Sequence, residues 1–185
     1  PTLLSKRLKE LEWHGILKRV ESPMGSRKSE YVLTQAGIEL FDVINAIGSW
    51  GKRWIDMRHN LDSAKENLLI WDIRRNLRME YFPINSAVLQ INITDVPKKT
   101  SNWWFIFDGK ERPDVGYLDP SLDVDLYIET SLSSLTKVWL GESPLATESK
   151  AGTLQIEGSQ KMIETFESWF GVNNFAAIPK FSIAS

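Results

Sequence analysis

Four polar side chains at the front of the chain are spaced so that one helical face would carry hydroxyls and amines. At about 100° per residue, the leucines of this stretch fall on one side of a helix and the polar residues on the other. The polar residues are Thr2, Ser5, Lys6 and Lys9, and the leucines are Leu3, Leu4, Leu8 and Leu11. Such a helix can lie in the major groove of DNA while its apolar back packs on its own domain. The same pattern is typical of the solvated face of an ordinary helix, and the spacing alone does not decide between the two.

The elements that would position this helix follow directly in the sequence. Gly15 favours the left-handed conformation that closes a helix. Two β-prone runs at 16–20 and 31–33 flank a Ser-, Pro- and Gly-rich stretch at 21–30, which predicts a hairpin with a long loop. Basic residues on or beside this hairpin could reach flanking phosphates; they are Lys18, Arg19, Arg27 and Lys28. Thr34 can cap a second helix, in which apolar residues recur at three- and four-residue steps to about Arg58.

The charge of the chain is unevenly distributed. Residues 1–59 contain ten Lys and Arg against seven Asp and Glu, a net charge of +3, whereas the rest carries −5, which gives the total of −2. A basic front on an acidic body is expected when only one domain meets phosphate. Because +3 over 59 residues is modest, the charge favours a nucleic-acid role only slightly.

Three pieces of the front stretch follow one another at defined spacing: LSKRLKEL at 4–11, GILKR at 15–19 and EYVLTQAG at 30–37. Together they resemble the HxlR family of bacterial winged-helix regulators. Their serial order and spacing are more specific than any one piece alone. IGSWG at 47–51, followed by Trp54, also resembles the terminal helix of that family.

The resemblance implies that Leu3–Trp13 is a recognition helix, that Glu21–Ser29 is the wing, and that a homodimer binds double-stranded DNA. The groove and wing residues that it implies are Thr2, Ser5, Lys6, Lys9, Arg27 and Lys28. Arg7 matches the motif but lies nearer the apolar side of the helix. Family members have further helices ahead of the recognition helix, so we expect an N-terminally incomplete winged helix here. Without those helices Leu4, Leu8 and Leu11 would stay exposed, and the stabilisation that their burial supplies would be lost, about 5–8 kcal/mol in total at about 1.5–3 kcal/mol each.

A second domain is expected behind a boundary at residue 60, so that residues 1–60 are the partial winged helix and residues 61–185 the other domain. Ser63 and Glu66 have the spacing of a capping box at the start of a helix. Strands are predicted at 87–94, 103–107, 124–129 and 153–157, with helices at 132–139, from Ser143 and from Ser159. This order of elements predicts an α+β fold.

Three later stretches form a second series: LSSLTKVWLG at 132–141, AGTLQIEGS at 151–159 and the closing helix. Together they resemble the C-terminal half of sterol-carrier-protein domains. That family folds as a mostly antiparallel sheet covered by helices around an apolar tunnel, which implies a small hydrophobic ligand. The candidate pocket residues are Trp103, Trp104, Phe105, Phe107, Leu126, Ile128, Val138 and Trp139. Plain core packing accounts for the same aromatic set, and only one face of the 103–107 strand can look into a tunnel.

Enzymatic chemistry finds little support in the sequence. Zero cysteines exclude disulfides, thiolate metal sites and cysteine nucleophiles. His14 and His59 lack metal-ligand spacing, and the acidic residues Asp119, Asp123 and Asp125 lack the pattern of a calcium loop. We predict no catalytic residue, no metal and no cofactor. No apolar run approaches the roughly 18 residues of a membrane helix, and no signal-peptide layout occurs, so a cytoplasmic protein without a membrane partner is expected.

These features predict a two-domain transcription regulator that binds DNA, is not an enzyme and senses a small hydrophobic ligand. The alternative is a carrier of lipids or other hydrophobic molecules, in which the front segment serves only in dimerisation.

Overall fold

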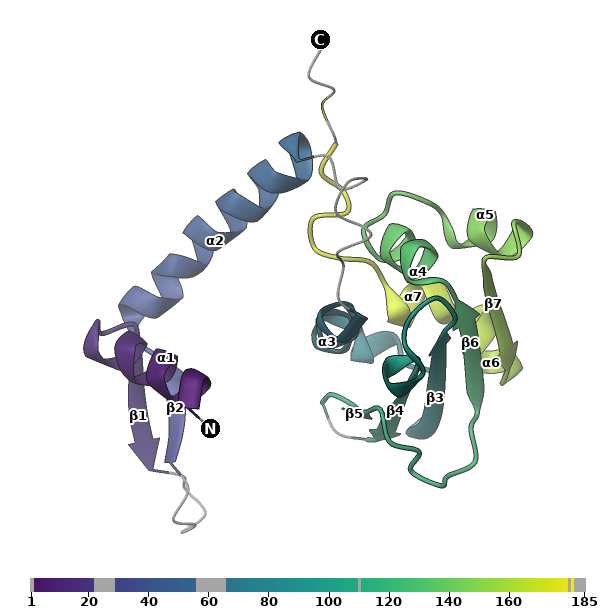
Figure 1. Ribbon diagram of the computed structural model, residues 1–185, viewed down its shortest axis with the longest axis horizontal. Coiled ribbons are helices and arrows are strands. Elements are labelled where there is room, and N and C mark those ends of the chain that lie inside the picture. Colours follow the sequence, from purple (N-terminus) through teal and green to yellow (C-terminus); the bar gives the residue numbers. More distant parts are fainter. Residues whose placement is uncertain (1, 22–28, 56–65, 110, 180, 182–185) are drawn as a thin grey trace. The chain divides into compact units, whose positions relative to one another are not determined.

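The computed structural model describes residues 2–21, 29–55, 66–109, 111–179 and 181 (Figure 1). The chain divides into two compact units, one of Pro1–Trp54 with Phe181–Ser185 and one of Ile55–Lys180. The domain boundary predicted at residues 60 and 61 lies outside the described residues.

The first unit consists of a helix, a β-hairpin and a longer helix. In chain order these are α1 (Thr2–Trp13), β1 (Leu17–Glu21), β2 (Ser29–Leu33) and α2 (Gln35–Trp54). The two strands pair antiparallel, with Leu17 opposite Leu33 and Glu21 opposite Ser29. The order of elements agrees with the sequence prediction. The second helix ends at Trp54 instead of near Arg58, and Arg58 itself lies outside the described residues.

A tight corner joins α1, β1 and the start of α2. Gly15 has φ +71°, the left-handed conformation that favours glycine after a helix. The Thr34 hydroxyl donates to the carbonyl of Gly15 at 2.5 Å and accepts from the amide of Gly37 at 3.2 Å. A Cβ at Gly37 would lie 2.3 Å from the carbonyl oxygen of Ile16, so the start of α2 lies closer to the backbone just before β1 than any side chain allows. This corner fixes the orientation of α1 relative to the hairpin.

The second unit is built on a five-stranded sheet with the order β5-β4-β3-β6-β7. The strands are β3 (Ser86–Ile93), β4 (Asn102–Asp108), β5 (Asp114–Gly116), β6 (Leu126–Thr130) and β7 (Leu154–Gly158). All neighbours pair antiparallel except β3 and β6, which run parallel. The mostly antiparallel sheet that the sequence predicted is therefore present.

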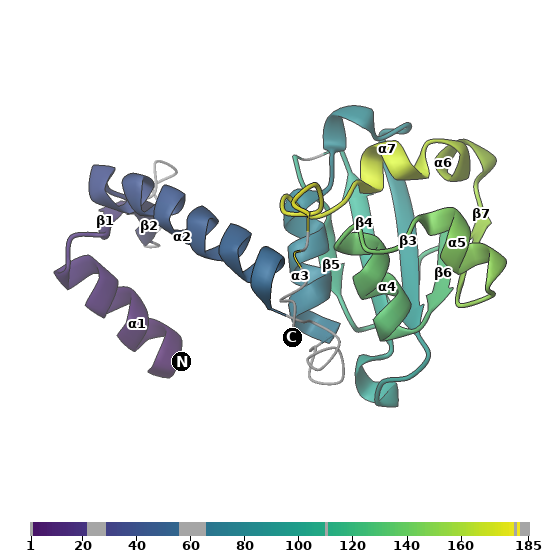
Figure 2. The same ribbon diagram turned by 90° about the horizontal axis from the view of Figure 1, so that it is seen from above.

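Helices that precede and follow the central strands in the sequence pack against this sheet (Figure 2). They are α3 (Glu66–Asn76), α4 (Leu132–Trp139), α5 (Leu145–Lys150), α6 (Gln160–Glu164) and α7 (Phe166–Phe170), with single 3-10 turns η3 (Met79–Tyr81) and η4 (Lys98–Thr100). One core joins the alternate inward residues of the strands to the inner faces of the helices. Fully buried members include Leu89, Phe105, Ile73, Leu135 and Trp169. Both units combine helices with antiparallel strands, so the predicted α+β class is confirmed.

The closing segment of the second unit differs from its prediction. The sequence pattern predicted one helix capped by the Ser159 side chain, whereas the structure has two short helices that meet at Thr165. The Ser159 side chain makes no capping hydrogen bond. The break turns Phe166, Trp169 and Phe170 into the core, where each is at most 3% exposed.

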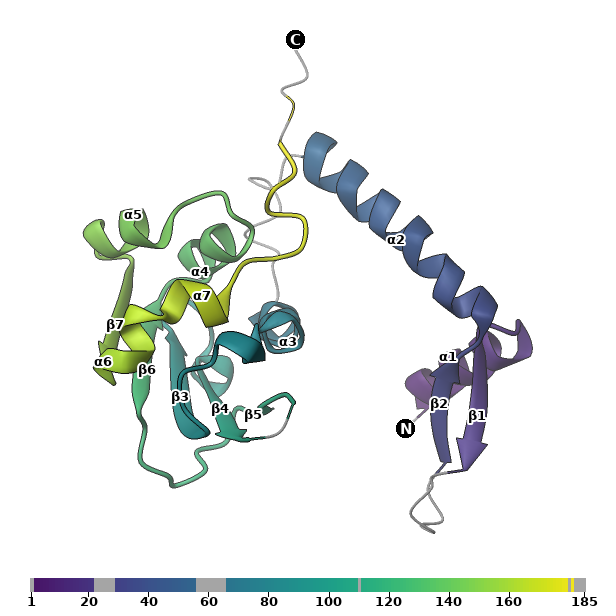
Figure 3. The ribbon, with the colours of Figure 1, turned by 180° about the vertical axis from the view of Figure 1, so that it is seen from behind.

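Polar side chains connect α3 to α4 and to the segment after α7; these elements lie side by side in the ribbon (Figure 3). The Asp72 carboxylate accepts from the Trp139 indole at 2.7 Å and from the Asn173 amide at 2.8 Å. Hydrogen bonds to a charged acceptor are stronger than neutral ones. Asp72 therefore stabilises the helical layer of this unit.

Candidate nucleic-acid interface

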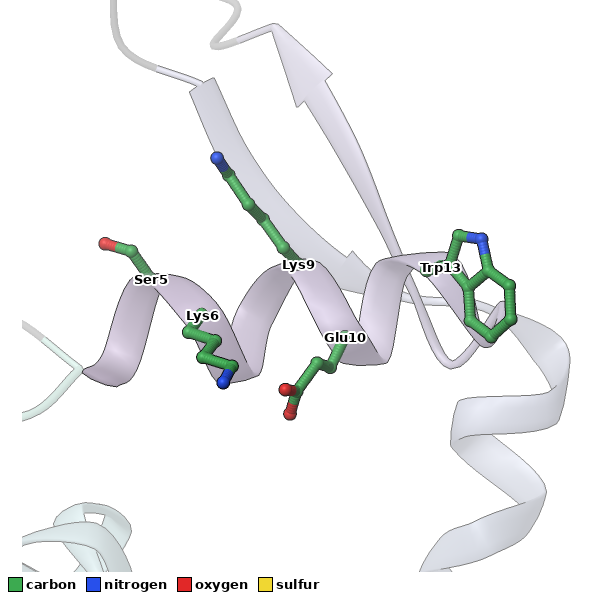
Figure 4. A pocket seen from close by; sticks show the side chains of 5 residues that line it. All are labelled: Ser5, Lys6, Lys9, Glu10 and Trp13. Carbon is green, nitrogen blue, oxygen red and sulfur yellow. The ribbon is translucent and has the colours of Figure 1, made fainter. Parts of the chain in front are cut away.

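One face of α1 carries the polar side chains that the sequence analysis selected. A shallow hollow of about 570 Å³ lies along this face, lined by Ser5, Lys6, Lys9, Glu10 and Trp13 (Figure 4). Ser5 and Lys9 point to one edge of the helix, Lys6 and Glu10 to the other, and Trp13 stands at the far end. The structure thus brings three of the predicted groove residues together. Thr2 is the first residue of α1, and its side chain is not described.

The two lysines of this face supply free positive charge. Lys6 and Lys9 are exposed, and within the described part of the chain neither takes part in an ion pair. Arg7 differs from them, because its guanidinium is paired with the Glu10 carboxylate at 2.7 Å. The lysines are therefore the cations of α1 best placed to meet phosphate.

The opposite face of α1 is apolar and largely open. Leu3 and Leu4 are 68% and 70% exposed, and Leu11 is 39% exposed. Leu8 is half-buried. The helix is thus held to the described part of its unit mainly at its C-terminal end, through the corner at Gly15.

The hairpin places two of its basic residues on strand β1. Lys18 and Arg19 are exposed, and Arg19 donates from Nε to the Ser29 hydroxyl across the strand pair at 2.5 Å. Arg27 and Lys28, predicted as wing residues, lie outside the described residues. Their contribution stays a prediction.

Trp13 and Glu10 are members of the α1 face that the sequence analysis missed. Trp13 is 83% exposed, and its ring meets that of His14 edge-on at 4.7 Å between centroids. The spacing of Trp13 in the sequence could have placed it on this face, because it follows Lys9 by four residues and Lys6 by seven and so lies on the same side of the helix. Glu10 belongs to the same hollow although its charge is opposite to that of the lysines.

The aromatic residues predicted to line a ligand pocket lie in the interior of the second unit. Seven of the eight belong to its core cluster and are at most 6% exposed; they are Trp103, Phe105, Phe107, Leu126, Ile128, Val138 and Trp139. Trp104 alternates with Trp103 and Phe105 on β4, so it points to the other face of the sheet, where it is 9% exposed. The set therefore does not share one face.

A groove of about 270 Å³ lies beside the core of the second unit, between the end of α4, the start of α5 and α7. Its apolar lining includes Val138, Leu145, Phe166 and Phe170, and its polar lining includes Ser143 and Glu167. Among the predicted pocket residues, all of which are described, Val138 is the member that lines this groove. A volume just under 300 Å³ suits a small ligand.

Two of the three acidic residues near β6 accept backbone hydrogen bonds. Asp119 accepts from the amide of Ser121 at 2.8 Å, and Asp125 accepts from the amide of Val88 at 2.8 Å. Among the described residues no group of three or more His, Asp or Glu side chains is arranged to hold a metal ion. No helix in the described part of the chain is long and apolar enough to cross a membrane.

Comparison with solved structures finds domains similar to the second unit. A UbiJ-SCP2 ubiquinone synthesis protein is 18% identical with a TM-score of 0.42, over 57% of this chain and 88% of that one. Sterol carrier protein domain 2 of Helicoverpa armigera is 12% identical with a TM-score of 0.44, over 64% of this chain and 89% of that one.

Comparison of the first unit gives a family match. Residues 1–59 match the family model of the HxlR-like helix-turn-helix. The uncharacterized HTH-type transcriptional regulator YvaP of Bacillus subtilis (strain 168) is 43% identical over 54 residues, which are 29% of this chain. The match spans half the length of that relative. The match to the HxlR-like helix-turn-helix model falls on the stretch in which the three sequence pieces resemble that family.

Proposed function

We propose that this chain belongs to a DNA-binding transcription regulator in which α1 enters the major groove. The observation that supports it is the α1 face, where Ser5, Lys6 and Lys9 are exposed together and both lysines are free of ion pairs within the described part of the chain. The HxlR-like match over residues 1–59 supports the same function. Lysine amines would meet phosphates, and the hydroxyls of Thr2 and Ser5 would reach base edges or sugar. On this proposal Arg27 and Lys28 extend the contact to the flanking backbone.

The regulator would act as a homodimer through α2. Five apolar side chains recur at three- and four-residue steps along one side of this helix and are 43–64% exposed; they are Val43, Ile44, Ile47, Trp50 and Trp54. At a rise of 1.5 Å per residue, a 20-residue helix is about 30 Å long. A second copy of the same helix offers a self-complementary apolar surface, as a two-fold interface requires. It would also present two α1 helices to successive half-sites of DNA.

The second unit would bind a small apolar molecule in the groove between α4, α5 and α7. Apolar walls with a few polar groups are the usual composition of a ligand site, and here Ser143 and Glu167 are the polar groups. Binding there would act on DNA affinity by shifting the equilibrium between two arrangements of the dimer. The second candidate, a carrier of hydrophobic molecules with the first unit serving only in dimerisation, is favoured by the same α2 surface.

Salt dependence of DNA binding separates the two functions. Each lysine that neutralises a phosphate contributes about 0.9 to the slope of log K against log salt. We expect clear salt dependence for the full chain. Combining Lys6→Ala and Lys9→Ala should lower the slope by about 1.8 per protomer, which is about 3.6 for the dimer. The measurement is fluorescence anisotropy of a labelled duplex at several salt concentrations.

A matched control removes two lysines from the second unit. Lys98 and Lys99 are exposed on η4, and their replacement by alanine changes the net charge equally but should leave the slope unaltered. A slope near zero for the unmodified chain would contradict the regulator function and favour the carrier. An equal loss of slope in both double variants would show that net charge, not the α1 face, governs binding.

A further inference from the structure

The α1 face contains one carboxylate, which a surface built only to hold phosphate would not need. Glu10 lines the same hollow as Lys6 and Lys9, and its side chain points to the same edge of the helix as that of Lys6 (Figure 4). Its side chain is 40% exposed. A carboxylate facing a phosphate-lined groove lowers DNA affinity unless it finds a hydrogen-bond donor.

Arg7 offsets part of this cost. Its Nη1 donates to Oε2 of Glu10 at 2.7 Å, between residues three positions apart on the helix. An exposed pair of this kind is weak, so the carboxylate stays free to turn toward another donor. Within the described part of the chain, the hydrogen bonds of Glu10 leave its Oε1 available.

DNA offers few donors to a carboxylate. Phosphate and sugar oxygens of the backbone accept hydrogen bonds, so they repel it. In the major groove the donors are the N4 amine of cytosine and the N6 amine of adenine. The N6 amine of adenine lies beside the N7 acceptor, which also repels a carboxylate. Cytosine N4 is therefore the partner best matched to Glu10.

We propose that Glu10 makes α1 selective for cytosine at one base position of each bound half-site. This inference depends on the proposed function, in which α1 lies in the major groove. Glu10 and the lysines then have opposite effects: the lysines raise affinity for every sequence, whereas Glu10 lowers affinity for most sequences and spares those with cytosine at its position.

Selection from a randomised duplex library with the full chain tests this assignment. We expect the unmodified chain to prefer cytosine at one position by about 5- to 150-fold, the range of a good base contact. Glu10→Ala should lose the preference at that position and retain the others. It should also bind a random duplex more tightly, because one negative charge is gone. Glu10→Gln should shift the preference toward adenine, since a glutamine amide can both accept from N6 and donate to N7.

Two control variants separate base selection from charge. Lys9→Ala should weaken binding to all sequences about equally, and Arg7→Ala should weaken binding but retain the cytosine preference. An unchanged base preference in Glu10→Ala would overturn the assignment, as would loss of the preference in Arg7→Ala alone. A chain that binds DNA with clear salt dependence but no cytosine preference would overturn this inference and leave the proposed function standing. Salt-independent binding, or none, would overturn both.

Discussion

At the scale of single residues, Glu148 is a buried carboxylate held by hydroxyl groups. It is 8% exposed, and the Thr153 hydroxyl donates to its Oε2 at 2.7 Å. Hydrogen bonds from Ser143 and then Thr153 hold the pKa of the Glu148 carboxyl below its ordinary value of 4.5, while burial opposes this shift. The ionised form therefore stabilises the join between α5 and β7.

The lowered pKa of Glu148 predicts a stability that depends on pH. Because its pKa is lower in the folded than in the unfolded state, its contribution is complete above the unfolded value and is lost as the pH falls through the folded value. Glu148→Gln should lower the free energy of unfolding by about 1.5–3 kcal/mol at pH 7, the scale of hydrogen bonds to a charged group. The deficit should shrink below about pH 4. Urea titrations at pH 7 and pH 3.5 measure both quantities.

The exposed Glu157 on β7 provides the matched substitution. Glu157→Gln should change the free energy of unfolding by well under 1 kcal/mol at pH 7. A Glu148→Gln deficit of the same size at both pH values would contradict the role of the ionised carboxylate.

The residues of the α1 face were only partly predictable from the sequence. Lys6 and Lys9 follow from helical spacing, since charge opposite a leucine stripe is a strong local signal. Trp13 lies on the same stripe, but an aromatic residue near a helix end is also expected in a core. Glu10 could not be selected by charge, because a search for phosphate contacts looks for cations. The structure shows that the side chains of Trp13 and Glu10 lie on the same accessible surface as the lysines, which the sequence pattern did not predict.

At the scale of elements, the apolar stripe on α2 predicts where two copies meet. Ile47 is 64% exposed at its centre, so Ile47→Asp would place a charge against the partner helix. We expect this variant to raise the dissociation constant of the dimer at least tenfold, as measured by analytical ultracentrifugation.

Ile38 offers a control on the same helix. It is 54% exposed and lies nine residues before Ile47, which at about 100° per residue puts it on the opposite side of α2. Ile38→Asp should leave the dimer intact. A monomeric unmodified chain, or equal dissociation in both variants, would contradict the α2 interface.

The elements were easier to predict than their arrangement. Alternation of apolar residues identified β3 and β6, a short run that is apolar on both faces identified β4, and helical spacing identified α1 and α4, because these patterns are local. The parallel pairing of β3 with β6 joins residues such as Leu89 and Leu126 that are far apart in the chain, and no local pattern encodes it. The break at Thr165 was missed because the apolar spacing continues across it, while tertiary packing of Phe166 and Trp169 decides the geometry.

At the scale of the whole molecule, the proposed sensing is a statement about linked equilibria. If a ligand in the groove changes DNA affinity by some factor, DNA must change the affinity for that ligand by the same factor. Couplings of this kind are typically 5- to 150-fold. The reciprocity is a property of the binding free energies and holds for any arrangement of the two units.

N-phenyl-1-naphthylamine, a small uncharged apolar dye, serves as the probe for this linkage. We expect the full chain to bind the dye in the groove. A saturating duplex should then change the dissociation constant of the dye by the same factor by which saturating dye changes the dissociation constant of the DNA.

Val172 lies at the groove and is 37% exposed, so Val172→Trp should block dye binding by filling the space. Leu118→Trp, at a residue that is 75% exposed and does not line the groove, should bind dye normally. Dye binding that persists in Val172→Trp would contradict the groove as the site. If dye and DNA both bind but neither changes the affinity for the other, DNA binding and the groove are retained and the proposed sensing is contradicted, because a ligand with equal affinity for both states shifts no equilibrium.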